Sequence, residues 1–473
     1  MGIVVVCILI LYGVTVIHHA RKPLPAGVDV ATPWRAATDV ALLLDTSYVD
    51  ADGVQRNEAA IFDEVFRLIA AAERLVVLDM FLVNDFAGDT GEGHRPLSRE
   101  LADVLIARKR ARPDLVAVLI TDPFNNLYGG IESSLFDDLE AAGVRVIETD
   151  LTRLRDPNPI WSGLWRICCQ WFGNTLRNGW LPDPVGDGKV TLRTWLRLLN
   201  FKANHRKTLV VDAGDDWVGL VTSANPHDAS SLHSNQAVRF HGRAALDLLA
   251  TEDAVARFSG SPDAFSVPER APVDDAHGDA ALRIVTESRI REVALELIGG
   301  AEAGDQLDLA MFYLAHRDVI EAFIRAAERG VAIRVILDPN KGAFGREGSG
   351  IPNRQVAMEL TRAEIDVRWC NTRGEQCHSK FLLRTGADGA VDLLAGSANL
   401  TRRNLDNYNL ETNVHLRGTF DVPALDAVRI AFDERWNNEP DRVHSVDYDV
   451  YADHRRWRYL VYRFMEATGL STF

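Results

Sequence analysis

Two stretches of the chain share one pattern that decides the fold: HRKTLVVD at residues 205–212 and HSKFLL at residues 378–383. Each places a lysine two residues after a histidine and continues into an apolar run. Ser-Ala-Asn then follows at 223–225 and at 397–399, so that the serine comes 18 residues after the first histidine and 19 after the second. Two such pairs at nearly equal spacing indicate an internal repeat with a shared function.

The segments before the two motifs also repeat. Residues 61–74 have a helical pattern and lead into the apolar run 75–81, and residues 290–303 lead in the same way into 307–312. Each half then shows a further helix, a buried strand that ends in Asp-Pro, and another helix and strand. This alternation predicts an α/β fold of two similar halves, each a mostly parallel sheet flanked by helices.

The length of 473 residues also favours two domains of similar size. Between the halves lies a stretch rich in proline, serine and acidic residues without periodicity, which is typical of a linker. The predicted parts are a membrane anchor or signal segment at 1–22, a first half with a Trp-rich insertion at 23–258, a linker at 259–280, and a second half at 281–473.

The chain begins with a mostly aliphatic run at residues 2–17, followed by His18, His19, Arg21 and Lys22. The run is slightly shorter than the roughly 20 residues that span a bilayer. Because no small-x-small cleavage site follows it, we expect a retained anchor in the cell membrane rather than a cleaved signal. The two basic residues after it favour a cytoplasmic body.

Composition narrows the classes of function. The formal net charge is -15, so the whole molecule repels nucleic acid and anionic lipid unless basic groups gather locally. The cysteines are odd in number and lack CxxC spacing, which predicts neither a disulfide framework nor a metal site. They are Cys7, Cys168, Cys169, Cys370 and Cys377, and Cys377 is expected to be a packed thiol.

A phosphodiester can be cleaved without a metal by a nucleophile, an acid for the leaving group, positive charge and orienting donors. Two histidines, two lysines and two Ser/Asn pairs supply this set, so we expect no cofactor. Side chains two apart on a strand point to the same face, so each His-Lys pair can face one phosphate. Asp122 and Asp338, which end buried strands, are expected to form turns rather than act as acids.

The motif HxKxxxxD followed by Gly/Ser-x-Asn, present twice, resembles the phospholipase D superfamily, including bacterial cardiolipin synthases and lipid-hydrolysing phospholipases. The resemblance covers both halves and implies a phospholipase D-like fold for each. It implies that one histidine becomes a phosphohistidine and that the other protonates the leaving group. Carried onto this chain, it favours His205 as the nucleophile and His378 as the acid, with the reverse order open.

The resemblance also implies an acidic partner for each histidine, for which Asp228 and Glu411 are the nearest matches, with Asp406 as a competitor. The second motif departs from the family at Thr385, where the first has Asp212. That aspartate could stabilise the turn after the strand, and Asp388 lies close to the changed position. The implied catalytic residues are His205, Lys207, Asp212, His378 and Lys380, with Ser223, Asn225, Ser397 and Asn399 binding substrate and no residue binding metal.

The insertion before the first motif is rich in tryptophan and in basic residues, as is the stretch 455–464. Such segments suit a bilayer interface, although an amphipathic helix packed on the domain would have a similar composition. We therefore expect a phospholipid substrate with an alcohol or water as acceptor, a membrane partner, and no nucleic acid. A nuclease using the same residues and a non-catalytic membrane scaffold are the alternatives. One chain carries both motifs, so a monomer can form a complete site.

Overall fold

The computed structural model describes residues 2–37, 39–86, 93–177, 179–186, 188–268, 280–340, 342–343, 346–471 and 473. The first half forms a sheet in the order β3-β2-β11-β10-β9-β4-β5-β6. Its strands are β2 (Ala41–Val49), β3 (Gln55–Glu58), β4 (Leu75–Met80), β5 (Val116–Thr121), β6 (Arg145–Glu148), β9 (Lys207–Ala213), β10 (Asp216–Thr222) and β11 (Asn235–His241).

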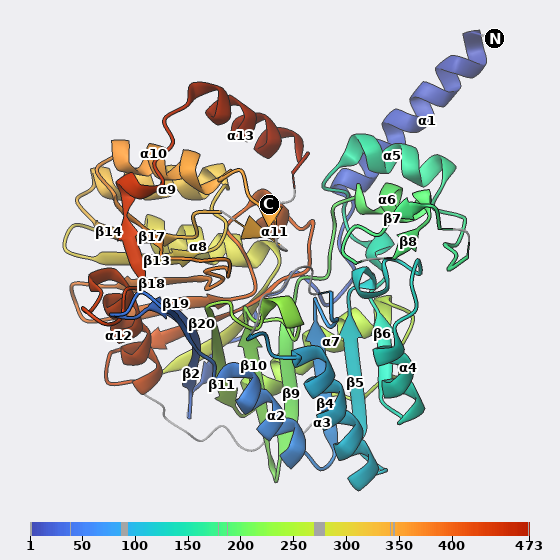
Figure 1. The fold of residues 1–473 in the computed structure, drawn as a ribbon, viewed down its shortest axis with the longest axis horizontal. Coiled ribbons are helices and arrows are strands. Elements are labelled where there is room, and N and C mark those ends of the chain that lie inside the picture. The colour runs from blue at the N-terminus through green and yellow to red at the C-terminus, as the bar shows by residue number, and fades with distance from the viewer. Residues whose placement is uncertain are drawn as a thin grey trace.

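The second half forms a sheet in the order β1-β12-β20-β19-β18-β13-β14-β17-β21, so its strands β12 to β17 repeat the order of β2 to β6. Its strands are β1 (Arg35–Ala36), β12 (Ala281–Thr286), β13 (Gln306–Met311), β14 (Ala332–Leu337), β17 (Asp366–Cys370), β18 (Phe381–Thr385), β19 (Val391–Gly396), β20 (Thr412–Gly418) and β21 (Ser445–Asp447). The two similar α/β halves are as predicted (Figure 1). Short ribbons β7 (Leu181–Pro182) with β8 (Lys189–Val190) and β15 (Gly342–Ala343) with β16 (Arg346–Glu347) lie apart from both sheets.

Strand directions differ from the predicted mostly parallel sheets. Only β4-β5-β6 and β13-β14-β17 are parallel, and the strands that follow each motif are antiparallel. The reason is the length of the connections, because parallel neighbours need a crossover of a dozen or more residues. β9 and β10 are joined by residues 214–215 alone, where Gly214 has φ +61°, so they can only form a hairpin.

Helices cover both faces of each sheet. Outer helices α2 (Ile61–Ala71), α3 (Leu97–Ala111) and α4 (Ser134–Ala141) pack on the first sheet, and α8 (Ser288–Gly299), α9 (Arg317–Glu328) and α10 (Asn353–Arg362) on the second. α7 (Arg243–Phe258) and α12 (Pro423–Asn437) lie in the core that the halves share. α7 contacts β12 and α12 contacts β2, each in the opposite half. The halves therefore share one hydrophobic interior.

The halves also exchange backbone near the predicted boundaries. β1 pairs with β12, so residues 35–36 complete the second sheet although they precede the first. α7 ends at Phe258 and β12 begins at Ala281. Of the predicted linker at 259–280, residues 269–279 lie outside the described residues.

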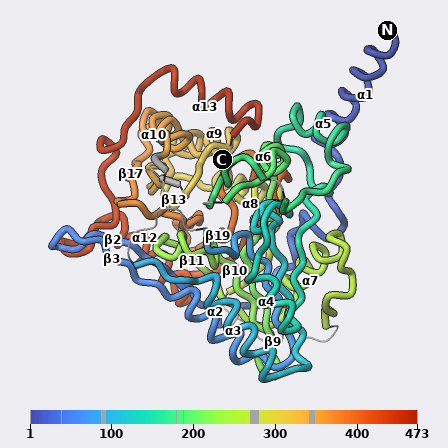
Figure 2. The backbone as a smooth tube through the Cα atoms, turned by 45° about the vertical axis from the view of Figure 1, so that its right-hand side comes forward, coloured from blue at the N-terminus to red at the C-terminus, as the bar shows by residue number. Residues whose placement is uncertain are grey.

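An N-terminal helix projects from the body. α1 (Gly2–Arg21) has a mean hydropathy of 2.3 over its most apolar window, and none of that window is buried. The helix is long and apolar enough to cross a membrane, although a signal sequence would have the same length and composition. It touches the body at α5 (Pro159–Cys168), where Tyr12 Oη donates to Ile160 O at 2.7 Å. Figures 1 and 2 show α1 leaving the molecule beside α5. This helix is a sign of a membrane anchor.

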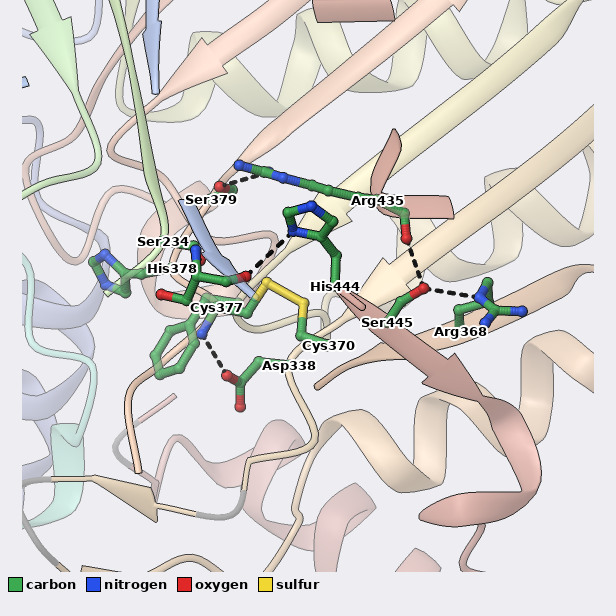
Figure 3. Close-up of a disulfide and its surroundings, with 12 residues drawn as sticks. Ser234, Asp338, Arg368, Cys370, Cys377, His378, Ser379, Arg435, His444 and Ser445 are labelled. Carbon is green, nitrogen blue, oxygen red and sulfur yellow. Dashed lines mark hydrogen bonds between the residues drawn. A yellow bond between two sulfur atoms is a disulfide. The ribbon is translucent and has the colours of Figure 1, made fainter. Parts of the chain in front are cut away.

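Two disulfides correct the expectation from cysteine spacing. Cys168 bonds Cys169, and Cys370 at the end of β17 bonds Cys377 just before the second motif, with their Cα atoms 6.2 Å apart (Figure 3). The pairing depends on β17 and the motif segment lying side by side, which spacing alone does not reveal.

A buried ion cluster of Arg206, Glu252 and Glu287 fixes the first motif in place. Arg206 lies between the motif histidine and lysine and points to the opposite face of the strand. Its Nη2 is 2.8 Å from Oε1 of Glu287 in the second half, and its Nη1 is 3.4 Å from Oε2 of Glu252 in α7. All three side chains are fully buried. This cluster links the motif to both halves.

We expect Arg206→Met to lower the free energy of unfolding by about 3–5 kcal/mol, because it leaves two buried carboxylates without their cation. Chemical denaturation at pH 7 measures this. Arg67→Met, which breaks the exposed Arg67–Glu64 pair on α2, should cost at most about 1 kcal/mol. A loss at Arg206 no larger than that of the control would contradict the structural role.

Candidate active site

Each motif histidine stands just before its strand and is held by the backbone of the other half. His205 N donates to Leu410 O at 2.9 Å, and His378 N donates to Ser234 O at 2.8 Å. Parallel bridges join Asn204 to Leu410 and Ser234 to Cys377. The two contacts occupy equivalent positions in the two halves, and each joins one half to the other. The two motifs therefore lie at the junction of the halves.

Two buried aspartates fix the residue before each histidine. Asp122 Oδ2 accepts from Asn204 N at 2.7 Å, and Asp338 Oδ2 accepts from Cys377 N at 2.8 Å. Burial raises the pKa of each carboxyl to about 7. They shape the turns after β5 and β14, as expected, and they also anchor the motifs.

His205 receives its carboxylate partner from the second half. Its Nδ1 lies 2.9 Å from Oε1 and 3.0 Å from Oε2 of Glu411, which is fully buried before β20. Ser397 Oγ and Asn404 Nδ2 also donate to this carboxylate. With Nδ1–H donating to Glu411, the Nε2 atom of His205 keeps its lone pair.

His378 has an amide partner from the first half. Its Nδ1 donates to Asn235 Oδ1 at 3.1 Å, and Ser223 Oγ donates to the same oxygen at 2.9 Å. Asn235 therefore occupies the place that Glu411 has beside the other histidine. The two centres match in layout and differ in charge.

The expectation that Asp228 orients a histidine is corrected by these contacts. Asp228 Oδ1 accepts from N and Oγ of Ser98 at 3.0 and 2.8 Å, and the competitor Asp406 pairs with Arg291 and His316. Each histidine takes its partner from the strand after Ser-Ala-Asn in the opposite half. Asn235 and Glu411 stand at matching positions at the starts of those strands. This match is the feature of the sequence that could have predicted that each half supplies the partner of the other half's histidine.

Both motif lysines lie over an aromatic ring and are fully buried. Lys207 Nζ donates to His205 O at 2.8 Å and lies 5.1 Å from the ring centre of Phe81, and Lys380 Nζ donates to His378 O at 2.9 Å. Phe312 is 5.5 Å from Lys380 Nζ, which mirrors Phe81. In the described residues neither ammonium group lies within 4 Å of a carboxylate, so their charge is available to an anion.

The serine and the asparagine of each Ser-Ala-Asn segment make different contacts. Ser223 and Ser397 bond the histidine partners, as given above. Asn225 Oδ1 accepts from Leu82 N at 3.4 Å, and Asn399 Oδ1 accepts from Tyr313 N at 3.2 Å. The serines thus support the histidines, while each asparagine is fixed through its carbonyl.

Asp212 lies at the opposite end of β9 from His205. Its Oδ1 accepts from Arg74 N and Leu75 N, both at 2.8 Å, where β4 begins. The implied catalytic assignment of Asp212 is therefore corrected to a structural one. In the second half Asp305, which precedes β13, accepts from Ala387 N at 2.9 Å and pairs with Arg384, so Thr385 needs no carboxylate.

Electrostatic interactions link the four motif side chains. Burial lowers the pKa of His205 to about 4, with Glu411 opposing and Lys207 and Lys380 assisting. Burial lowers the pKa of His378 as well, assisted by Lys380, Lys207 and His205. Burial lowers the pKa of Lys207 to about 7 and also lowers that of Lys380. A phosphate anion entering here would offset these positive charges.

Among the described residues, no group of three or more His, Cys, Asp or Glu is placed to hold a metal ion.

Residues 295–436 match the family model described as "Cardiolipin synthase, PLD-like domain". Over these residues, the second half of the chain is similar to the phospholipase D-like domain of that family. A comparison with curated protein sequences found no match. Among solved structures, phosphatidylserine synthase from Haemophilus influenzae Rd KW20 is similar, with a TM-score of 0.55 and 10% identity over 92% of this chain and 94% of that one. This likeness shows that the two proteins share a fold over both halves of this chain.

Two further structures are more distant. Polyphosphate kinase from Porphyromonas gingivalis has a TM-score of 0.47 and 15% identity, over 86% of this chain and 51% of that chain. Nuc from Salmonella typhimurium, a phospholipase D family member, has a TM-score of 0.28 and 18% identity, over 36% of this chain and 98% of that one.

The electrostatics of the site predict an unusual titration of His205. We expect the His205 imidazole to titrate near pH 4, and Glu411→Gln to lower that midpoint further, because the carboxylate stabilises the imidazolium. Nitrogen chemical shifts of histidine-labelled protein between pH 3.5 and 8 measure this, with the His205 signals assigned by their loss in His205→Ala.

Ser397→Ala is the matched control, since it removes a hydrogen bond to Glu411 and keeps its charge. It should change the midpoint less than Glu411→Gln. A wild-type midpoint near the ordinary 6.5 would contradict the prediction.

Proposed function

We propose that the protein cleaves phospholipid phosphodiesters without a metal and transfers the phosphatidyl group through a phosphohistidine. The observation that carries the proposal is the pair of histidines, one partly buried and the other buried, each held through Nδ1, beside two lysines that have no carboxylate partner among the described residues. Nδ1 hydrogen bonds leave Nε2 of each ring for chemistry. The lysines can neutralise the non-bridging oxygens of one phosphate.

In the first step, the Nε2 lone pair of His205 attacks phosphorus and the bond from phosphorus to the leaving oxygen breaks. Protonated His378 gives its Nε2 proton to that oxygen, so the head group leaves as a neutral alcohol. In the second step, an alcohol or water gives its proton to His378 while its oxygen attacks phosphorus, and the P–N bond breaks. Transfer and hydrolysis differ only in the acceptor.

The difference between Glu411 and Asn235 supports His205 as the nucleophile. A phosphorylated imidazole that keeps its Nδ1 proton carries positive charge, which the Glu411 carboxylate stabilises. His378 faces a neutral amide, which leaves its imidazolium the stronger acid. A bound phosphodiester raises the pKa of both rings relative to the empty site, because its negative charge favours the protonated forms.

Exposed aromatic residues support a membrane-borne substrate. Trp171 and Trp180 in the insertion are 73% and 66% exposed, and Trp457 and Phe464 of α13 (Arg456–Thr468) are 57% and 59% exposed. Figures 1 and 2 show α13, α5 and α1 at the same end of the molecule. Large apolar side chains beside an anchor helix suit a bilayer interface better than a nucleic acid.

The direct test incubates the detergent-solubilised protein with phosphatidylglycerol, and with phosphatidylcholine plus ethanol, in the presence of EDTA. We expect cardiolipin or phosphatidylethanol by mass spectrometry, and a loss of about 10³-fold or more in His205→Ala and His378→Ala, because each ring is needed in both steps. Phosphatidic acid alone would assign hydrolysis. No lipid turnover, with cleavage of single-stranded DNA that requires His205, would replace the proposal by the nuclease alternative.

A labelled donor separates the two roles. With phosphorus-32 phospholipid, His378→Ala should form an acid-labile phosphoenzyme slowly and then retain it, because both its formation and its breakdown lack His378, and His205→Ala should form none. The opposite pattern would reverse the order of the histidines.

The membrane contact has its own test. In vesicles that contain brominated phosphatidylcholine, we expect tryptophan fluorescence to be quenched, and the triple change of Trp171, Trp180 and Trp457 to Ser to remove most of the quenched part. Trp217→Phe and Trp369→Phe change buried rings and serve as controls that keep it. Equal quenching in the triple variant and the wild type would contradict contact of these rings with lipid.

A further inference from the structure

Arg403 is a half-buried cation, and two of its nitrogens have no hydrogen-bond partner in the described structure. It lies in α11 (Arg402–Leu405), and its Nε and Nη2 are shielded from solvent without a hydrogen bond. Among the described residues, no carboxylate oxygen lies within 4 Å of its guanidinium group. Its contact is the ring of Phe201, whose centre is 5.4 Å from Cζ. Buried arginines here, such as Arg206 and Arg166, are paired with carboxylates.

Arg403 stands close to the supports of both motif histidines. Phe201 precedes His205 by four residues, and Asn404, next to Arg403, donates to the Glu411 carboxylate that binds His205. On the other side, Tyr313 interacts electrostatically with Arg403. The Tyr313 ring is 4.1 Å from that of Phe312, which in turn is 5.0 Å from the ring of His378.

The surroundings of Arg403 contain two tyrosine hydroxyls and, in the pocket that Arg403 lines, the carboxylate of Glu466. Its electrostatic partners are the hydroxyls of Tyr128 and Tyr313, which stay neutral because burial raises their pKa. Arg197 lies over the Tyr128 ring at 4.9 Å and adds a second cation. Glu466 lines the same pocket as Arg403, yet the cations that act on it are Arg463, His316, Arg402 and Arg317.

Two N–H groups that are shielded from solvent and make no hydrogen bond are costly, and unsatisfied groups of this kind call for a partner. Burial lowers the pKa of Arg403 only to about 10, so the group is charged at neutral pH. A guanidinium group with free donors matches the oxygens of a phosphate, and tyrosine hydroxyls can donate to the same oxygens. Contacts through Phe201, Asn404 and Tyr313 connect this position to the surroundings of both histidines.

We propose that Arg403, with Tyr128 and Tyr313, forms a second anion subsite, which binds a phosphate of the donor or the acceptor other than the one that is cleaved. This inference rests on the proposed function for the identity of the cleaved phosphate. The subsite selects substrates that bring two anionic groups to the junction of the halves. Lys207 and Lys380 hold one, and Arg403 holds the other.

Binding tests the subsite without any turnover. In the full chain with His378→Ala, we compare glycerophosphoglycerol, with one phosphodiester, and bis(glycerophospho)glycerol, with two, by calorimetric titration. We expect the two-phosphate probe to bind at least tenfold more tightly, and Arg403→Gln to abolish that preference. Arg403→Lys should retain part of it, and Arg325→Gln, an exposed change on α9, should retain all of it. No preference in the parent, or a preference that survives Arg403→Gln, would overturn the subsite.

Kinetics distinguish the source of the second phosphate. With phosphatidylcholine as donor, Arg403→Gln should slow transfer to glycerol 3-phosphate at least tenfold more than transfer to glycerol if the acceptor brings it. If the donor brings it, the variant should slow an anionic donor selectively with glycerol as acceptor. Equal slowing of every pair would overturn the proposal. Absence of all lipid turnover would refute the proposed function and leave the binding result to decide the subsite.

Discussion

The exchange of partners between the halves is the constraint on which the rest of the structure depends. His205 is held through its backbone by Leu410 and through its ring by Glu411, while His378 is held by Ser234 and Asn235. Neither half therefore contains a complete support for its own histidine. The shared core around α7 and α12 and the Arg206 ion cluster keep the two sheets in the register that these contacts need. Any motion of one half against the other would change both histidines at once.

The two halves are nearly symmetric, and the main difference between the surroundings of the His205 and His378 rings is one carboxylate. Glu411 and Asn235 occupy matching places, so backbone geometry gives the histidines similar settings and the side chains give them different charge. A difference of one charge in a buried site outweighs small differences in distance, because the surrounding dielectric is low. One substitution in a repeated framework is therefore enough to give two equivalent histidines different electrostatic surroundings.

Much of the fold followed from the sequence, because the repeated order of apolar runs and the two His-x-Lys motifs are local patterns. The aromatic residues Phe81 and Phe312 stood at matching places in those runs. The partner exchange was not predicted, since His205 and Glu411 lie 206 residues apart and only the packing of the halves joins them. Strand direction was wrong where a short loop made a hairpin, and Asp212 was misassigned because a motif does not say which end of a strand carries the chemistry. The Cys370–Cys377 bond depends on a tertiary contact that spacing does not encode.

The position of Glu411 late in the chain has a consequence for synthesis. Domains generally fold as they leave the ribosome, from the N-terminus onward. His205 is translated 206 residues before Glu411, and Lys380 also comes from the second half. During most of translation the first half can form its sheet, yet its histidine has neither carboxylate nor second cation. The surroundings of His205 are therefore incomplete until the start of β20 has been made, and a chain that terminates before Glu411 lacks this carboxylate altogether.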